Sequence, residues 1–234
     1  MEQNFELSER KVDIQDKRIA DIIIYQLDAI KGHYDENLEL ITKQFPIAEQ
    51  LKQEGNVEAA ETIWRTQIVL LSSAFDFFMH EIVWYGLDKI YDGDWPQTEQ
   101  YKNLSIRLET LQTIMEDLDS KTWFADYITE KYKTQTIMIF GDVRDHLNLI
   151  GVSVDNVAKE AFYQQGCSVK PKDQMKQKLD GLYSRRNRIA HQTDRSERDA
   201  ERQAISDGQV ITFIEDVNKI VVAIMGEKRK RLLQ

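Results

Sequence analysis

The sequence predicts an all-α protein, a helical bundle of long core helices into which a set of shorter helices is inserted. Three prolines and ten glycines are few for 234 residues, which favours long helices over a turn-rich β architecture. Apolar residues recur at helical spacing through several long stretches. With 41% apolar and 30% charged residues, the chain can bury a substantial core. We therefore treat residues 1–234 as a single all-α domain, with a helical elaboration at about 96–166.

The first predicted helix spans about residues 12–45, where apolar side chains follow helical spacing. These side chains belong to Ile19, Ile22, Ile23, Leu27, Ile30, Leu38, Ile41 and Phe45. Gly32 is a candidate interruption of this helix. Pro46 is expected to end it, because a proline inside a helix removes a backbone hydrogen bond. Asn56 follows a glycine and is a residue type that caps the start of a helix.

The central core helix is predicted at about 57–90, because one regular apolar stripe runs along it. The stripe consists of Ala60, Trp64, Ile68, Leu71, Phe75, Phe78, Ile82 and Tyr85. Asp76 and His80 stand four residues apart and therefore on one face, where the carboxylate could hold the imidazole. Because three phenylalanines surround the pair, we interpret it first as structural. A supporting role in a functional site is the alternative.

Four shorter helices are expected after a loop at residues 92–96, at about 104–118, 123–132, 136–150 and 154–162. A longer helix is expected to start at Pro171, since proline suits the first turn. Its apolar stripe consists of Met175, Leu179, Leu182, Arg186 and Ile189. A buried guanidinium is costly without an anion, so Arg186 should meet a carboxylate, a second subunit or a substrate phosphate. Asp76 is the candidate carboxylate.

The chain is expected to end in a helix that follows a polar surface connection at about 193–201. Ser206 or Asp207 can cap this helix. Its apolar residues are Val210, Phe213, Ile214, Val217, Ile220 and Ile224. The basic run at 228–231 suits the negative C-terminal end of a helix, and we interpret it first in that way.

Several classes of protein are disfavoured by the composition. The single Cys167 leaves no intrachain disulfide and no thiolate-rich zinc cluster, which fits a reducing cytoplasm. His80 and Glu81 begin like a zinc-protease helix, but Trp84 occupies the position of the second ligand. No phosphate-binding glycine loop occurs, so no cofactor is expected. The N-terminus does not resemble a secretion signal and charged residues interrupt the apolar runs, so we expect no membrane contact.

The charge of the chain is unevenly distributed. The net charge is −9, which argues against a protein whose whole surface binds nucleic acid. Residues 170–202 contain ten Lys or Arg and six Asp or Glu, a local charge of +4 that leaves −13 elsewhere. The sequence therefore predicts one local basic region.

This basic region contains the motif that carries the functional prediction. Residues 184–191 place three arginines beside His191, one of four histidines. The pattern of Arg186, Asn187, three further residues and His191, between two apolar helices, resembles the signature of HEPN-superfamily ribonucleases, most closely the RiboL-PSP-like HEPN branch. The run at residues 72–81 also looks like the first core helix of that branch. Arg186, Asn187 and His191 are the matching positions.

The resemblance implies a helical bundle that cleaves RNA as a homodimer without a metal ion. The 2′-hydroxyl would attack the adjacent phosphorus and leave a 2′,3′-cyclic phosphate and a 5′-hydroxyl. It also implies a toxin or host-defence effector, with a nucleotidyltransferase-like antitoxin as a possible partner. The alternatives are a non-catalytic helical RNA-binding or protein-interaction module and, last, a helical metalloenzyme, because the four histidines lack ligand spacing.

The residue types suit that chemistry. His191 is the side chain best suited to proton transfer near neutral pH, because the reference pKa of histidine is about 6.5. Arg186 would stabilise negative charge on the phosphoryl oxygens, and Asn187 would orient the imidazole or the phosphate. The remaining arginines of the motif region are expected to contact flanking phosphates. They are Arg185, Arg188 and Arg195.

Helix geometry adds a constraint on these residues. Five residues turn the side-chain direction by about 500°, or about 140° net, so Arg186 and His191 of one chain face different ways. Asn187 and His191 share a face. Two copies of the motif across a two-fold axis would let both chains line one cleft, and Gly181 could permit the close approach.

Overall fold

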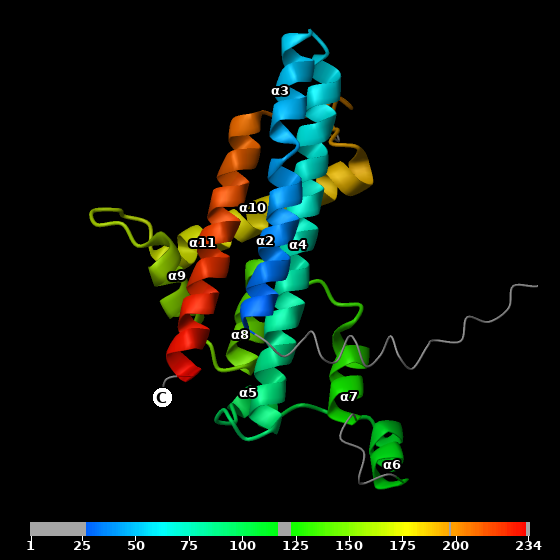
Figure 1. The fold of residues 1–234 in the computed structure, drawn as a ribbon, viewed down its shortest axis with the longest axis vertical. Helices are drawn as coiled ribbons and strands as arrows, with labels where there is room; N and C mark the ends of the chain where they lie inside the picture. Colours follow the sequence, from blue (N-terminus) through cyan, green and yellow to red (C-terminus); the bar gives the residue numbers. More distant parts are fainter. Residues whose placement is uncertain (1–26, 117–122, 197, 233–234) are drawn as a thin grey trace, which may run out of the picture.

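The protein is a bundle of α-helices arranged around one long central helix. The computed structural model describes residues 27–116, 123–196 and 198–232, and no β-strand occurs in these ranges. The long helices are α2 (Leu27–Thr42), α4 (Val57–Tyr91), α10 (Pro171–Gln192) and α11 (Asp207–Leu232). In Figure 1, α2, α4 and α11 run alongside one another and α10 crosses them. The predicted all-α fold class is confirmed.

The central helix α4 forms as the sequence predicts. The Asn56 side chain accepts a hydrogen bond from the Ala59 backbone N–H at 3.3 Å and so caps its first turn. All eight residues of the predicted apolar stripe are buried. The helix packs against α2, α10, α11 and α3 (Phe45–Gln53). Neighbours on several sides explain why α4 is apolar over so much of its surface.

The length and apolar composition of α4 would also allow it to cross a membrane, which the sequence analysis did not expect. The core helix of a soluble protein meets the same criterion. In the fold, 61% of the most apolar 18-residue window of α4 is buried. Its central place in the bundle therefore accounts for its composition.

The first predicted helix differs from the structure at its C-terminal end. Residues 12–26 lie outside the described residues, and α2 runs through Gly32 without interruption to Thr42. Pro46 does not end this helix. Instead it occupies the first turn of α3, where its missing N–H would have no helical partner. The sequence analysis missed α3 because a proline marks the start of one helix as readily as the end of another.

The middle of the chain forms shorter helices below and beside the long ones (Figure 1). They are α5 (Glu99–Lys102), α6 (Leu108–Glu116), α7 (Trp123–Tyr132), α8 (Phe140–Leu149) and α9 (Val154–Phe162). The predicted bounds of α7 and α9 are correct. The predicted helices at 104–118 and 136–150 begin later in the structure, and α5 was not predicted. Helix α9 packs on α10 and α11, so this segment supports α10 from its N-terminal side.

The basic run at 228–231, which we interpreted first as charge that suits the C-terminal end of the last helix, includes one residue that lies in the core, Lys228. Its side chain is fully buried, and its Nζ lies 3.9 Å from the centroid of the Trp95 ring. This cation lies against Gly86 of α4. A Cβ added at Gly86 would come within 2.7 Å of Lys228 Nζ and 2.7 Å of Ile150 Cβ. The absence of a side chain at Gly86 thus lets α11 and the end of α8 approach α4.

We predict that Gly86→Ala lowers the free energy of unfolding by about 1–3 kcal/mol, because the added methyl group has no room. Gly32→Ala is the matched control, since a Cβ added there would meet no atom within 4 Å. That control should gain up to about 1 kcal/mol from the better helix propensity of alanine. Urea denaturation measures both changes. A Gly86→Ala protein as stable as the wild type would contradict the close approach.

Candidate nucleic-acid site

Helix α10 presents one face to the core and the other to solvent. Met175, Leu179 and Leu182 are buried, as the apolar stripe predicts. Asn187 and His191 stand four residues apart on another face, near the C-terminal end of the helix, and His191 is exposed. The predicted shared direction of Asn187 and His191 is therefore present in the fold.

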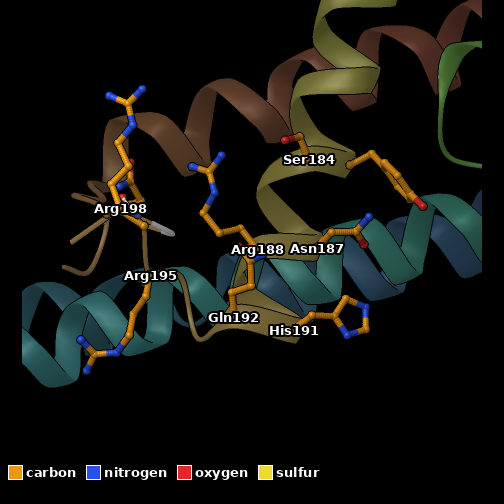
Figure 2. A pocket seen from close by; sticks show the side chains of 10 residues that line it. Ser184, Asn187, Arg188, His191, Gln192, Arg195 and Arg198 are labelled. Carbon is orange, nitrogen blue, oxygen red and sulfur yellow. Dashed lines mark hydrogen bonds between the residues drawn. The ribbon is translucent and has the colours of Figure 1, made fainter. Parts of the chain in front are cut away.

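An open pocket with a volume of about 720 Å³ lies over the end of α10 and the connection that follows it. It is lined by Tyr183, Ser184, Asn187, Arg188, His191, Gln192, Arg195, Ser196, Arg198 and Gln203. Among these described residues, three are arginines and none is acidic. Figure 2 shows Arg188 and Arg198 rising toward one side of the pocket, while Asn187 and His191 lie next to each other. The arrangement can accept an anion beside a titratable imidazole.

The pocket brings together four of the six residues that were predicted to be catalytic or RNA-binding. They are Asn187, Arg188, His191 and Arg195. Arg185 and Arg186 do not line it. The sequence analysis did not name Arg198 and Gln203, which come from the connection between α10 and α11. Membership of the basic segment 170–202 was the available signal for Arg198, whereas the sequence held no signal for Gln203.

Arg186 is half-buried and supports Asn187 from outside the pocket. Its Nη1 donates a hydrogen bond to the side-chain oxygen of Asn187 at 2.9 Å. A guanidinium group can only donate, so the amide oxygen must face Arg186. The amide NH₂ of Asn187 is thereby left to donate to another group. Among the described residues, no carboxylate pairs with Arg186, and the candidate Asp76 accepts from the Ile137 backbone N–H at 2.6 Å instead.

Asp76 and His80 lie away from the pocket. The Nε2 atom of His80 is 3.8 Å from Asp76 Oδ1 and 2.8 Å from the carbonyl oxygen of Gln135. A carbonyl oxygen only accepts, so Nε2 carries the hydrogen in that contact. The two side chains thus join α4 to the connection between α7 and α8. This geometry favours the structural interpretation of the pair.

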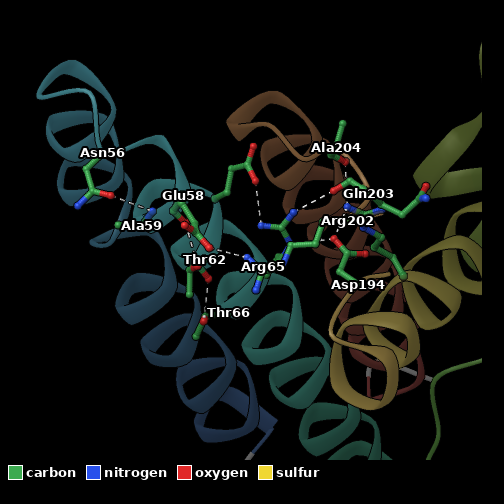
Figure 3. A network of polar contacts seen from close by, with 12 residues as sticks. Asn56, Glu58, Ala59, Thr62, Arg65, Thr66, Asp194, Arg202, Gln203 and Ala204 are labelled. Atoms are coloured by element: carbon green, nitrogen blue, oxygen red, sulfur yellow. Dashed lines mark hydrogen bonds and ion pairs between the residues drawn. The ribbon is translucent and has the colours of Figure 1, made fainter. Parts of the chain in front are cut away.

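The connection after α10 is anchored by a buried carboxylate that the sequence analysis did not identify. Asp194 is fully buried, and its Oδ2 accepts from Arg65 Nε at 2.8 Å and from Arg185 Nη2 at 2.8 Å. Arg65 belongs to α4 and also donates to the Gln203 carbonyl oxygen at 2.9 Å. Figure 3 shows this network between α4 and the connection. The prediction that 193–201 is a surface connection is therefore wrong at Asp194.

Arg185 belongs to this network and not to the pocket. Besides Asp194, its Nη2 donates to the Ala204 carbonyl oxygen at 2.9 Å. Burial lowers the pKa of the Arg185 guanidinium, and the charges of Arg188 and Arg65 lower it further, whereas Asp194 opposes the shift. These contacts give Arg185 a role in the fold, and the phosphate contact expected from the sequence stays a prediction.

Helix α10 ends in a strained turn. Thr193 and Asp194 both have positive φ, at 50° and 62°. The left-handed conformation is unfavourable for a β-branched residue such as threonine. Backbone hydrogen bonds from Asp194 N to Arg188 O and from Gln203 N to Asp194 O hold the turn, at 2.9 and 2.8 Å. The buried ion pairs of Asp194 accompany this conformation.

Comparison with known proteins gives one finding. A family model described as RiboL-PSP-HEPN matches residues 33–225, most of the chain. The match includes α4, the middle helices, α10 and the whole pocket. No curated protein and no solved structure matches the chain.

We predict that Thr193→Gly is more stable than Thr193→Ala by about 1–2 kcal/mol, because only glycine avoids the cost of a Cβ in the left-handed region. Both variants lose the threonine side chain, so their difference isolates the backbone conformation. Chemical denaturation of the two proteins provides the measurement. Equal stabilities would show that residue 193 is not left-handed in solution.

Proposed function

This chain belongs to the RiboL-PSP-HEPN family, and from that membership we propose that it is an endoribonuclease that cleaves RNA without a metal ion. Membership supports a nuclease function of the ribonuclease type. The observation that carries the proposal for this chain is the pocket at the end of α10, which is lined by His191, Asn187 and three arginines. Among the described residues, no three His, Cys, Asp or Glu side chains are placed to hold a metal ion.

The proposed reaction needs only the RNA and proton transfer. The 2′-oxygen forms a bond to the adjacent phosphorus, and the bond from that phosphorus to the 5′-oxygen breaks. A proton leaves the 2′-hydroxyl and another reaches the 5′-oxygen, so the products are a 2′,3′-cyclic phosphate and a 5′-hydroxyl. His191 is exposed in the pocket and can carry out one of these transfers. Asn187 can donate its NH₂ to a phosphoryl oxygen or to the substrate.

The arginines of the pocket suit the phosphates that flank the reacting one. Among the described residues, no hydrogen bond is made by the guanidinium groups of Arg188 and Arg198. Arg195 donates one hydrogen bond to the Ala200 carbonyl oxygen at 2.6 Å and keeps further N–H groups. A local excess of positive charge on a chain of net charge −9 would direct RNA to this pocket.

The position of Arg186 supports a site completed by a second copy of the chain. Arg186 does not line the pocket that His191 lines, and its guanidinium group donates to Asn187 instead of pointing into that pocket. We propose that two chains meet across a two-fold axis, with Arg186 of one chain beside His191 of the other. Gly181 is exposed, and a Cβ added there would meet no atom within 4 Å. Its surface is therefore open to a partner helix.

A ribonuclease of this kind would harm the cell that makes it, so the proposal extends to a toxin or host-defence effector in the cytoplasm. A nucleotidyltransferase-like antitoxin would be a fitting restraint. Growth arrest on expression of the wild type, but not of His191→Ala, would support this role. Equal growth of cells that express the wild type and cells that express His191→Ala would contradict the toxin role, but not the proposed reaction.

We predict that His191→Ala lowers the cleavage rate by about 10²-fold or more, because proton transfer is lost. Its melting temperature and helical content should stay near those of the wild type, since the side chain is exposed. His146→Ala is the matched control, because His146 lies on α8 outside the pocket and should retain cleavage. The assay follows a defined RNA in EDTA at low and high salt, and binding should weaken as salt rises.

Three results would contradict this assignment. Wild-type protein that binds RNA but leaves it intact favours the non-catalytic interaction module. Cleavage by His191→Ala at the wild-type rate would remove His191 from the reaction. Cleavage that appears only after divalent ions are added would instead favour a metalloenzyme.

We predict that Arg186→Ala and His191→Ala are each inactive alone and regain cleavage when mixed. In an equal mixture half of the dimers contain one chain of each kind, and one of their two clefts is complete. Recovery should approach about a quarter of wild-type activity. Light scattering should give a dimeric mass at the assay concentration. No recovery, or a monomeric mass where RNA is cut, would rule out the shared cleft.

A further inference from the structure

We propose that Asp194 is a positioning residue that, through Arg65 of α4, sets where Arg195 and Arg198 stand in the pocket and thereby controls how tightly RNA is bound. The inference rests on the proposed ribonuclease function. It further proposes that the site consists of two parts that are positioned separately. One part lies on α10 and the other on the connection after it. Asp194 stands at their junction.

The two parts are positioned by different forces. Asn187 and His191 belong to α10, so regular helix hydrogen bonds fix their direction. Arg195 and Arg198 follow the end of the helix, and helix geometry does not place them. They belong instead to a turn that folds back on itself. Residues 195 and 202 form an isolated antiparallel bridge, and Ser196 N donates to Glu201 O at 2.9 Å.

Two side chains of α4 contact this turn: Glu58 accepts from Arg202 Nη1 at 2.9 Å at the exposed edge, and Arg65 holds the buried base. Arg65 donates from Nε to Asp194 Oδ2 at 2.8 Å and from Nη2 to the Gln203 carbonyl oxygen at 2.9 Å. Asp194 and Gln203 are in turn joined by a backbone hydrogen bond of 2.8 Å. Arg65 thus grips both sides of the turn where it leaves the core. It does not line the pocket itself.

Burial makes this anchor rigid. Asp194 is 0% exposed and Arg65 is 7% exposed. Separating the two groups would take from each a charged partner in a buried position, which is unfavourable even though each keeps a second partner. Arg65 also donates from Nη1 to Glu61 at 3.1 Å, and Arg185 supplies the second guanidinium to Asp194. The turn therefore stands in one place relative to α4, and its two pocket arginines stand with it.

Loss of the anchor should affect RNA binding more than the chemical step. With the turn released, Arg195 and Arg198 no longer meet the flanking phosphates together. The helix still carries Asn187 and His191. We expect a higher KM and a nearly unchanged kcat. The two arginines contribute to RNA binding equally before and during the reaction, and they take no part in the proton transfer.

The test compares Asp194→Asn with Arg65→Gln, two variants that change the local charge in opposite directions. If charge alone mattered, Asp194→Asn would bind RNA more tightly and Arg65→Gln more weakly. The positioning role predicts that KM rises in both, by about tenfold for the loss of two phosphate contacts. The plot of log Kd against log salt should become shallower by about 1.4 in both, because each contact to single-stranded RNA contributes about 0.7. The salt dependence is measured in the inactive His191→Ala background, so that the RNA stays intact.

The double variant and a stability control separate positioning from general destabilisation. Asp194→Asn with Arg65→Gln should raise KM no further than either change alone, since both release the same turn. Ile220→Val removes a methylene group from a fully buried residue of α11 that does not line the pocket. It should lower the melting temperature and leave KM unchanged. If Asp194→Asn does not fold, Arg65→Lys is the substitute. Lysine keeps the positive charge but cannot donate to both Asp194 and the Gln203 carbonyl oxygen as the guanidinium does, so KM should rise in the same way.

The outcomes are distinguishable. Raised KM in both single variants, with kcat within about twofold of the wild type, supports the proposal. An unchanged KM with a reduced kcat would mean that only the folded fraction had fallen, and opposite shifts in KM would assign the effect to charge. Either result would overturn the positioning role while leaving the ribonuclease intact. Failure of the wild type to cut RNA would overturn the ribonuclease function and this inference together.

Discussion

Two guanidinium groups share one carboxylate that has no contact with solvent, and the connection that forms one side of the α10 pocket is anchored by that interaction. An unpaired charge in that position would be strongly destabilising, so Asp194 requires Arg65 and Arg185 to meet it. The three residues come from the central helix, the end of α10 and the connection that follows. Their meeting fixes the left-handed turn that ends α10 and brings the polar connection back against the core. Without it, the pocket would lack one of its two sides.

The side chains of the pocket are positioned in two different ways. Asn187 and His191 owe their common direction to the helix, and Arg186 holds the Asn187 amide from behind at 2.9 Å. The arginines beyond the helix owe their place to tertiary contacts. In the proposed reaction, Asn187 and His191 contact the reacting phosphate. The arginines beyond the helix contact the phosphates on either side of it. Arg186 lies outside the pocket that His191 lines, which is the observation behind the proposed second copy.

The parts of this structure that the sequence predicted are those governed by local rules. The α4 stripe and the shared face of Asn187 and His191 follow from helical periodicity, and the Asn56 cap follows from the preference of asparagine for helix starts. Pro46 was misread because its ring is compatible with a helix start and incompatible with a helix interior. The burial of Lys228 and Asp194 was not predicted because it depends on distant partners. Asp194 meets Arg65 across 129 residues of sequence, and Lys228 lies against Trp95 and Gly86.

The central claim is that, in the pocket at the end of α10, the 2′-hydroxyl of RNA attacks the adjacent phosphorus. The most direct test is ³¹P NMR of a short single-stranded RNA incubated with the protein in EDTA. The account predicts that a phosphodiester resonance is replaced by that of a 2′,3′-cyclic phosphate, and that His191→Ala prevents the change. A phosphomonoester formed without a cyclic intermediate, or an unchanged spectrum with the wild-type protein, would contradict it.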